Sequence, residues 1–480
     1  MEWIVLIVIT IWAGSSVIER FSKKSQKISY NGGYYSIRKT VNTPMPKLNE
    51  KRIDISDIKL SFEQQKLFEK LENNNNHIFI TGKAGTGKSI LLQYFKKNSS
   101  KRLVVVAPTG VAALNVGGQT IHSLFRIPPE FITKDKLRLT SKTALLLRNI
   151  DAVVIDEISM VRADLMDAID HLLRQARSNN IPFGGVQIVM FGDLYQLPPV
   201  VHDAELHKYF ADNHGGYYFF NAHAWKDSLP EIYELSTIFR QKDETFKEIL
   251  NDIRKGNIKD QTLSLLNSRV SAETPEDGII TLVTTNSLVS EINHQRLAQL
   301  DEKLKEYRAI ITGNLQQSSF PTEEVLRLKK SAQVMLLKND REKRWVNGTL
   351  GYIASLSSDE VKVNIDNIVY SVPRETWSKI RYYYNQEKRI VEEEVISSFT
   401  QFPLRLAWAV TVHKSQGQTY GLVAVDMGDG AFAHGQTYVA LSRCRSLEGL
   451  YLKRGIINKD IIVDTAVINF MNKAKVLEVN

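Results

Sequence analysis

Short runs of apolar residues alternate along the chain with segments of helical periodicity. Strands that are apolar on both faces and alternate with helices are typical of a parallel sheet covered by helices. One expected helix carries its apolar residues three and four apart, at Leu165, Ile169, Leu172, Leu173 and Ala176, and we expect this face to pack in the core. The pattern predicts an α/β lobe at residues 59–230, with strands in "HIFIT" from His77, "LVVVA" from Leu103, "AVVID" from Ala152 and "VQIVMF" from Val186.

A second series of apolar runs predicts a second α/β lobe, made of residues 231–301 and 401–480. Its strands are expected in "IITLVTT" from Ile279, "GLVAVDM" from Gly421 and "GLYLKR" from Gly449. Residues 302–400 differ, because "NGTLGYI", "VKVNI" and "IVYSV" are short alternating segments separated by Gly and Asn turns. Such segments indicate a small β module inserted into the second lobe.

The first 27 residues carry a separate apolar segment. Trp3 to Ile18 contains no charge, and Arg20, Lys23, Lys24 and Lys27 follow it. A helix of this length would be roughly 24 Å long, slightly short of a hydrocarbon core of about 30 Å. Three interpretations remain open: a membrane anchor with the N-terminus outside and the body in the cytoplasm, a cleaved signal, or an apolar tail. Residues 28–58 are polar and contain Gly and Pro, which predicts a linker.

Composition adds two constraints. The chain has 480 residues, with 62 Lys and Arg against 53 Asp and Glu, for a net charge of +9. This balance favours polyanionic partners without identifying one. Cys444 is the single cysteine, so an internal disulfide and a multi-cysteine metal cluster are both excluded.

A phosphate-binding loop is expected after the first strand. "GKAGTGKS" matches G-x-x-x-x-G-K-[ST] and precedes the helical run "SILLQYFKK". Backbone N–H groups of such a loop surround phosphates, its lysine reaches the β and γ oxygens, and its hydroxyl residue binds Mg²⁺. The predicted ATP site therefore comprises Gly82, Lys83, Ala84, Gly85, Thr86, Gly87, Lys88 and Ser89.

Two carboxylates follow the strand in "VVIDEISM". Adjacent buried acids repel each other unless a cation lies between or beside them. We therefore expect Asp156 to hold Mg²⁺ and Glu157 to polarise the attacking water. The alternative is a solvated acidic turn.

Gln196 in "GDLYQLPPV" follows the next buried strand. Ligands of a parallel sheet bind beyond the carboxyl ends of its strands, so Gln196 is expected to share an edge with Lys88 and Glu157. An uncharged amide at this place can contact the γ-phosphate or orient the water. The alternative is an ordinary turn residue.

Several strings together resemble one family. "GKAGTGKS", "APTGVAALNVGGQTIHSLF", "VIDEISMV", "GDLYQLPPV", "IFRQKDETFKEILNDIRKG", "AVTVHKSQGQTY" and "YVALSRCRS" are similar in order and character to PIF-type DNA helicases, RecD-like members of superfamily 1B. The resemblance extends from about Leu60 to Arg454. It implies two RecA-like lobes, a wedge insertion at residues 127–149, an SH3-like module at residues 302–400, and ATP with Mg²⁺ as cofactors. It also implies 5′ to 3′ movement on single-stranded and fork DNA in genome maintenance, and no obligate protein partner.

The resemblance also assigns residues to the ATP site. It gives Gln64 the role of adenine reader, and places Gln416 and Gly417 in the cleft lining. It makes Arg240 and Arg443 arginine fingers, a role that suits guanidinium groups because they neutralise charge on the transferring phosphoryl group. Taken singly, such arginines are more often surface residues.

Nucleic-acid contacts follow from the same resemblance. Polar side chains after strand ends can donate to phosphates, and an aromatic ring can stack on a base. For Phe125 the alternative is core packing, and the run "RYYYNQEKR" is either a nucleic-acid surface or an exposed hairpin. The predicted contacts are Pro108, Thr109, His122 and Phe125 in the first lobe, and Thr411, His413 and Lys414 in the second.

The sequence thus predicts an ATP-driven DNA helicase. Two other functions stay open: a membrane-tethered switch that binds nucleic acid without unwinding it, and an RNA-directed motor.

Overall fold

The structure is a computed structural model that describes residues 59–128, 131–133, 137–201, 203–241, 243–270, 278–340, 342 and 344–479. These residues belong to one compact unit, residues 52–480. The predictions on the apolar segment and on the linker, residues 1–58, lie outside the described residues. Among the residues that are described, no helix is both long enough and apolar enough to cross a membrane.

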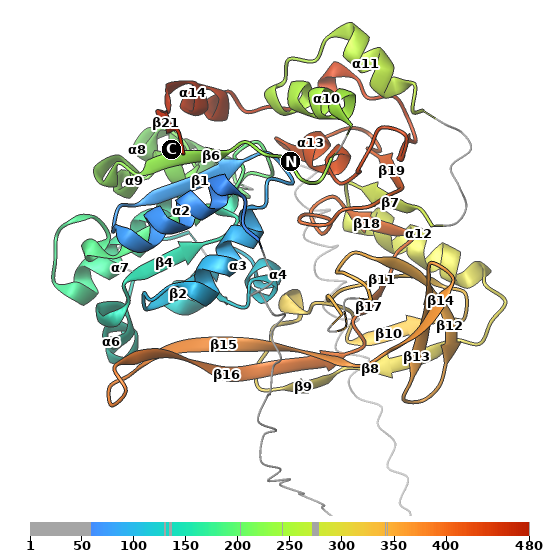
Figure 1. Cartoon of the computed structure of the whole chain (residues 1–480), viewed down its shortest axis with the longest axis horizontal. Helices are drawn as coiled ribbons and strands as arrows, with labels where there is room; N and C mark the ends of the chain where they lie inside the picture. The colour runs from blue at the N-terminus through green and yellow to red at the C-terminus, as the bar shows by residue number, and fades with distance from the viewer. Residues whose placement is uncertain are drawn as a thin grey trace, which may run out of the picture. The chain divides into compact units, whose positions relative to one another are not determined.

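The first parallel sheet carries the phosphate-binding loop. In the described part of the chain its order is β21-β6-β1-β5-β4-β2-β3, and every neighbouring pair is parallel. Its strands are β1 (Ile78–Gly82), β2 (Leu103–Ala107), β3 (Gln119–Thr120), β4 (Ala152–Ile155), β5 (Gln187–Phe191), β6 (Glu231–Leu235) and β21 (Val476–Leu477). The helices are α2 (Phe62–Asn73), α3 (Lys88–Asn98), α4 (Gly110–Asn115), α5 (Ile121–Phe125), α6 (Ser141–Asn149), α7 (Ala163–Arg177), α8 (Ala204–His214) and α9 (His223–Ser228) (Figure 1).

Both faces of this sheet are covered, which explains its apolar strands. Ile78 and Ile80 share a core cluster with residues of α2 and α3. Phe79 points to the other face, where its ring contacts Phe219 and Trp225 edge to face. The predicted apolar face of α7 is buried there as well, so its core packing is confirmed.

The boundary between the lobes needs a correction at residue 231. The prediction places residues 231–235 in the second lobe, but β6 pairs with β1 along its whole length in the first sheet. β21, near the C-terminus, extends the same edge by pairing with β6. The local pattern of "EIYEL" indicates a strand, but it does not specify which of two parallel sheets the strand joins.

A second parallel sheet has the order β18-β7-β19-β20 among the described residues. The predicted α/β class with two parallel sheets is therefore confirmed. The strands are β7 (Ile280–Val283), β18 (Ala409–Thr411), β19 (Val423–Asp426) and β20 (Leu450–Leu452). The accompanying helices are α10 (Glu244–Lys255), α11 (Asp260–Asn267), α12 (Asn286–Gln299) and α13 (Gln436–Leu441). α14 (Thr465–Lys473), predicted for the second lobe, packs against the first, where the Phe470 ring stacks on Phe220 with centroids 4.2 Å apart (Figure 1).

The inserted region is antiparallel wherever its strands are described, and it extends past its predicted end at residue 400, because β17 (Leu404–Leu406) pairs with β11 (Gln333–Leu336). A sheet of order β14-β13-β12-β11-β17 has its own core cluster, which includes Leu328, Val334 and Val363. Its strands are β11 (Gln333–Leu336), β12 (Leu350–Leu356), β13 (Val361–Ile365), β14 (Ile368–Val372) and β17 (Leu404–Leu406). The remaining strands are β8 (Lys305–Arg308), β9 (Ile310–Thr312), β10 (Val325–Leu328), β15 (Glu375–Asn385) and β16 (Ile390–Gln401).

The long hairpin β15–β16 connects this region with the first lobe. It runs beside α6 and α4 (Figure 1). Gln119 Nε2 donates a hydrogen bond of 2.7 Å to the Ile380 carbonyl, and Tyr382 is 5% exposed. The "RYYYNQEKR" segment is thus a hairpin, in which Arg381 pairs with Glu394 and Lys388 pairs with Glu392. The run is therefore a hairpin, as one of the two interpretations predicted, and its contact with nucleic acid stays a prediction.

Candidate functional site

The phosphate-binding loop joins β1 to α3 and depends on two glycines. Gly85 and Gly87 have φ values of +86° and +82°, a region that favours glycine. A Cβ on Gly85 would overlap Arg240 Cβ, and one on Gly87 would overlap Gln64 Nε2. The loop is therefore closely packed by the residues that the sequence assigns to the same site.

Lys88 occupies the first turn of α3. Its Nζ donates to the carbonyls of Gly82, at 2.7 Å, and Lys83, at 3.1 Å. Burial lowers the pKa of Lys88, while the charges of Asp193 and Glu157 oppose this shift. A phosphate that enters the loop offers the ammonium group stronger acceptors than these two carbonyls.

Gln64 lies on α2 and contacts the loop directly. Its Nε2 donates to the carbonyls of Thr86, at 3.4 Å, and Gly87, at 3.3 Å. Its Oε1 accepts from the N–H of Ser61, which completes a capping box at the start of the helix. The structure thus places Gln64 against the phosphate loop, and its role as adenine reader stays a prediction.

Asp156 and Glu157 follow β4 and share one buried edge of the sheet. β5 lies between β4 and β1, so the ends of the three strands meet there. Burial raises the pKa of both carboxyl groups, and the charge of Asp156 raises the pKa of Glu157 further. Ser89 is exposed to the same cavity. Mg²⁺ prefers oxygen ligands, and the Ser89 hydroxyl and the Asp156 carboxylate can supply them. A cation beside Asp156 would also stabilise the ionised form of its carboxyl group.

Gln416 connects the two lobes at this edge. Its Nε2 donates to Glu157 Oε2 at 3.0 Å and to Gln196 Oε1 at 3.2 Å. Gln196 is buried, and its own Nε2 donates to Asp193 Oδ2 at 3.4 Å. The side chains expected to polarise water and to contact the γ-phosphate are therefore joined through one amide of the second lobe.

Arg240 and Arg443 approach the same cavity. Arg240 lies between β6 and α10 and donates to the carbonyls of Ser442, at 3.3 Å, and Gly417, at 3.4 Å. Arg443, 1% exposed, follows α13 and donates from Nε to the Val439 carbonyl at 2.9 Å. Burial lowers the pKa of both guanidinium groups, that of Arg240 to about 9 with a further contribution from the charge of Arg443. An anion between two such cations would relieve their repulsion.

A cavity of about 1030 Å³ brings most of these residues together. Gly82, Lys83 and Gln64 lie at the loop but not in the lining of the cavity, and Gln416, predicted to line the cleft, is not among the lining residues either. The predicted residues that line it are Ala84, Gly85, Thr86, Gly87, Lys88, Ser89, Asp156, Glu157, Gln196, Arg240, Gly417 and Arg443.

Sequence reasoning missed Phe239 and Asn347 in the cavity lining. Phe239 is 54% exposed and directly precedes Arg240. Asn347 belongs to the inserted module, and its Oδ1 accepts from Gln418 Nε2 at 3.1 Å. Gly348, which follows, packs so closely that a Cβ on it would overlap Gln418 Oε1. The string "WVNGTLGYI" signals a turn at this place but no contact with nucleotide.

The first-lobe candidates for nucleic-acid contact differ in exposure. Pro108 and Thr109 follow β2, and Thr109 Oγ1 accepts from the N–H of Ala112 to cap α4. His122 is half-buried, and burial lowers its pKa. Phe125 is 0% exposed inside the main core cluster, so its prediction as a stacking surface is wrong and the alternative of core packing holds. The helix α5 turns this ring inward, where apolar contacts exclude a base.

The second-lobe candidates lie directly after β18. Thr411 is 4% exposed, and its Oγ1 accepts from the N–H of Lys414 at 3.2 Å. His413 and Lys414 are exposed. The geometry therefore leaves His413 and Lys414 accessible to a polynucleotide, while Thr411 shapes the turn that carries them.

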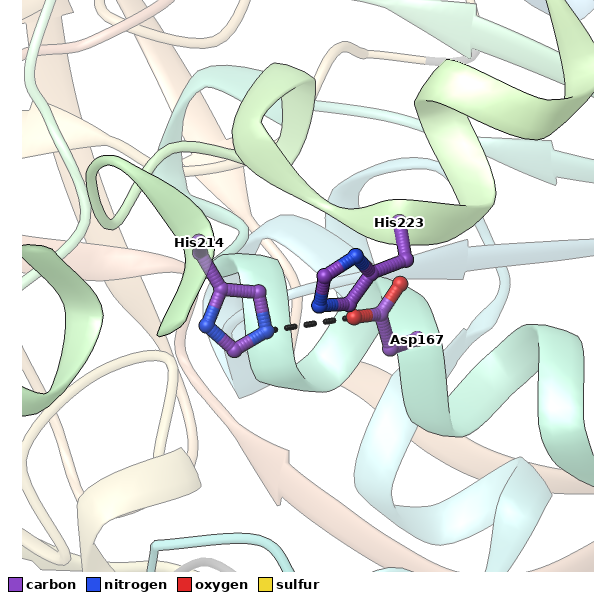
Figure 2. A group of neighbouring side chains, drawn as sticks. All are labelled: Asp167, His214 and His223. Carbon is purple, nitrogen blue, oxygen red and sulfur yellow. Dashed lines mark hydrogen bonds and ion pairs between the residues drawn. The ribbon is translucent and has the colours of Figure 1, made fainter. Parts of the chain in front are cut away.

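Asp167, His214 and His223 form a second cluster of polar side chains (Figure 2), and none of the three lines the ATP cavity. Their ligand-type atoms lie within 4.8 Å of one another. Asp167 Oδ1 accepts from the N–H of Ala224 at 2.8 Å, and Oδ2 lies 3.2 Å from His214 Nε2. Both carboxylate oxygens thus join α7 to α8 and α9, which gives the cluster a structural role.

Comparison with known proteins agrees with this geometry. A family model described as PIF1-like helicase matches residues 59–264. "ATP-dependent DNA helicase Pif1" of Bdellovibrio bacteriovorus is 34% identical over 432 residues, covering 87% of this chain and 92% of that protein. The human "ATP-dependent DNA helicase PIF1" is 34% identical over 394 residues, covering 78% of this chain and 57% of its own length.

Solved structures give the same likeness. Pif1 from Bacteroides sp in complex with ADP-AlF4 has a TM-score of 0.81 and 39% identity, covering 87% of this chain and 97% of that one. Bacteroides Pif1 bound to ssDNA has a TM-score of 0.63 and 40% identity over the same shares of the two chains. The unliganded Bacteroides protein has a TM-score of 0.80, so the structure described here is more similar to the nucleotide complex and to the unliganded protein than to the ssDNA complex.

Proposed function

The chain belongs to the PIF1-like helicase family, and we propose that it is an ATP-dependent DNA helicase that moves along single-stranded DNA and separates duplexes at forks. One observation carries this proposal. Gln416, from the second lobe, hydrogen-bonds both Glu157 and Gln196, from the first, at the edge of a cavity that the phosphate loop lines. ATP chemistry at this place acts on a contact between two lobes, which is what a motor requires.

The proposed hydrolysis uses the residues of this cavity. Lys88 binds the β and γ oxygens of ATP, and Ser89 with Asp156 would hold Mg²⁺. Bound Mg²⁺ would neutralise phosphate charge and orient the γ-phosphoryl group. Arg240 and Arg443 stabilise the charge that develops on the transferring group.

Glu157 accepts a proton from the attacking water in this proposal, and Gln196 orients that water. Glu157 must be ionised for this task. The charges of Lys88 and Arg443 both oppose the rise of its pKa and so favour the ionised form.

Coupling to DNA follows from the position of Gln416. His413 and Lys414 are exposed on the same short turn, between β18 and Gln416. A change at the γ-phosphate that moves Gln416 therefore moves these two DNA-contact candidates, and Thr109 with His122 supply the contacts of the first lobe. The 5′ to 3′ direction is part of this proposal and rests on family resemblance.

An unwinding assay on 5′-tailed and 3′-tailed duplexes tests motor, substrate and direction together. We expect ATP-dependent strand separation of the 5′-tailed duplex alone, and its loss in Glu157→Gln. Nucleotide-dependent DNA binding without strand separation on any tailed or forked duplex would contradict the proposal. A parallel assay with RNA tails at the same salt concentration separates a DNA helicase from an RNA-directed motor.

The segment 127–149 is proposed to act as the wedge at the duplex fork. Its described helix α6 packs against α7 and against β15 of the long hairpin. This contact gives the segment a rigid support from two parts of the chain. Replacing residues 127–149 by a short Gly-Ser linker should leave DNA-stimulated ATP hydrolysis in place but abolish unwinding. Equal unwinding by both proteins would contradict the wedge.

Membrane attachment through residues 3–18 is a separate proposal that rests on the sequence. The uncharged run and the four cations that follow it support an anchor with the body on the cytoplasmic side. We expect the full chain to sediment with membranes, and a chain that begins at residue 50 to stay in the supernatant. If both chains distribute equally between the membrane pellet and the supernatant, the anchor proposal is wrong.

A further inference from the structure

Asp193, Arg254 and Tyr438 form a buried cluster beside the ATP cavity, and none of them has a role in the hydrolysis proposed above. Their exposed fractions are 1%, 3% and 3%. Asp193 follows β5, Arg254 lies on α10, and Tyr438 lies on α13. Three elements of two lobes thus place a carboxylate, a guanidinium and a phenol in contact away from water.

The carboxylate of Asp193 contacts both other members of the cluster and Gln196 of the ATP site. Its Oδ1 accepts from Arg254 Nη2 at 3.0 Å. Its Oδ2 accepts from Tyr438 Oη and from Gln196 Nε2, each at 3.4 Å. The backbone N–H of Tyr195 also donates to Oδ1. The carboxylate therefore fixes the direction of the Gln196 amide, which leaves Gln196 Oε1 to face Gln416.

Tyr438 extends the cluster to the phosphate-binding loop. Its Oη accepts a hydrogen bond of 3.0 Å from the N–H of Ala84 while it donates to Asp193. The same helix leads to Arg443. The hydroxyl of Tyr438 thus connects the phosphate-binding loop, through Ala84, with Asp193, which in turn holds Gln196. The helix that carries Tyr438 also positions Arg443.

Arg254 favours the ionised form of the buried Asp193 carboxyl group. Burial opposes ionisation of Asp193, but the charges of Arg254 and Lys88 hold its pKa below the usual value. The Arg254 guanidinium also lies 4.3 Å from the centre of the Tyr195 ring, and 3.5 Å from Glu234 Oε1. Packed between these groups, it has a fixed position from which to orient the carboxylate.

We infer that Asp193, Arg254 and Tyr438 are positioning residues for ATP hydrolysis, which hold Gln196 and the phosphate loop in register with the second lobe. The inference rests on the proposed function and deepens it. A buried ion pair alone would stabilise or specify the fold without affecting turnover. Removing one hydrogen bond while keeping the packing distinguishes the two roles. A positioning role predicts a lower kcat, whereas a purely structural role predicts an unchanged kcat.

Tyr438→Phe makes this distinction, because it removes one oxygen and retains the ring. Tyr233→Phe is the matched control: Tyr233 is 2% exposed, and its hydroxyl donates to Glu231, away from the cavity. With saturating ssDNA, we expect Tyr438→Phe to lower kcat for ATP about tenfold, and to raise KM less than threefold. The melting temperature of Tyr438→Phe should match that of the control, whose kcat should equal that of the unmodified chain.

A double variant tests whether Tyr438 acts through Gln196. If it does, adding Tyr438→Phe to Gln196→Ala should lower kcat by less than a further twofold. A further tenfold loss, or a kcat of Tyr438→Phe within twofold of the unmodified chain, would overturn the inference.

Arg254→Lys supplies a third variant. It keeps the charge but loses the planar fork, and we expect a smaller loss of kcat than in Arg254→Ala. Equal losses in the two variants at equal melting temperature would also count against a positioning role. Absence of ssDNA-stimulated hydrolysis in the unmodified chain would overturn the proposed function itself, and this inference with it.

Discussion

The ATP cavity and the candidate DNA-contact turns both follow the ends of parallel strands, but their polar groups are used differently. In the cavity, Glu157 and Gln196 reach across to Gln416 of the other lobe. In the DNA-contact turns, Thr109 and Thr411 accept hydrogen bonds from their own turns. The first region is thus arranged by contacts between lobes, and the second by local contacts.

This difference predicts how substitutions in the two regions will affect ATP hydrolysis and DNA binding. A side chain in the cavity is positioned by partners far away in the sequence, so its loss should impair chemistry without unfolding a lobe. Thr411 closes its own turn and shapes the backbone there, and we expect its exposed neighbours His413 and Lys414 to contact DNA. Four substitutions test this division, beginning with the largest expected effect.

Arg443→Ala should lower kcat for ATP hydrolysis by about 10³-fold or more, the range measured for arginine fingers in phosphoryl transfer. Arg327→Ala is the control, because Arg327 is an exposed strand residue paired with Glu306. Steady-state hydrolysis with saturating ssDNA measures both. A loss of less than tenfold in Arg443→Ala would remove this residue from the transition state.

Phe125→Ala should destabilise the chain by about 3–5 kcal/mol, because it leaves a cavity in the main core cluster. A stacking residue would instead cost DNA affinity and leave stability unchanged. Urea unfolding and ssDNA binding, measured on the same protein at a temperature where it stays folded, separate the two. Weakened binding with an unchanged unfolding midpoint would restore the stacking role.

Lys414→Gln should weaken ssDNA binding severalfold and lower the salt slope of log K by about 0.7, the value for one phosphate contact on a single strand. Basal ATP hydrolysis without DNA should not change. Lys362→Gln, on β13 of the module and paired with Glu360, is the control. An unchanged salt slope in Lys414→Gln would exclude a phosphate contact.

Arg381→Gln should have the smallest effect, below about 1 kcal/mol in stability, because its partner Glu394 is also solvent-exposed. If the hairpin that carries "RYYYNQEKR" does not contact nucleic acid, ssDNA affinity should be the same as in the unmodified chain at every salt concentration. A reduced salt slope would show that this hairpin contacts DNA after all.

The site residues that the sequence alone could predict lie at the carboxyl ends of strands. Lys88, Asp156 and Gln196 each follow an apolar run, and parallel strands bring their carboxyl ends to one edge, so a short string fixes both identity and place. Arg240 and Arg443 needed the family resemblance, because nothing local distinguishes them from surface arginines. Both line the cavity.

The rest depends on contacts between residues that are distant in the sequence. Whether Phe125 stacks or packs depends on which way α5 turns its face, and "TIHSLF" is compatible with both. The partnership of Ala84 with Tyr438 joins residues 354 positions apart, and no spacing rule describes it. The local sequence of β6 likewise predicts a strand, but only its pairing with β1 shows which sheet the strand joins.

The hydrogen bond between Asn347 and Gln418 has a consequence for nucleotide exchange. It places a loop of the inserted module in the wall of the cavity through which ADP leaves and ATP enters. Gly348, next to Asn347, has a φ of +94°, a conformation that favours glycine, and it lies against the end of the Gln418 side chain. The module thus forms part of the opening of the nucleotide cavity, and we expect a displacement of the module to change the rate at which ADP dissociates.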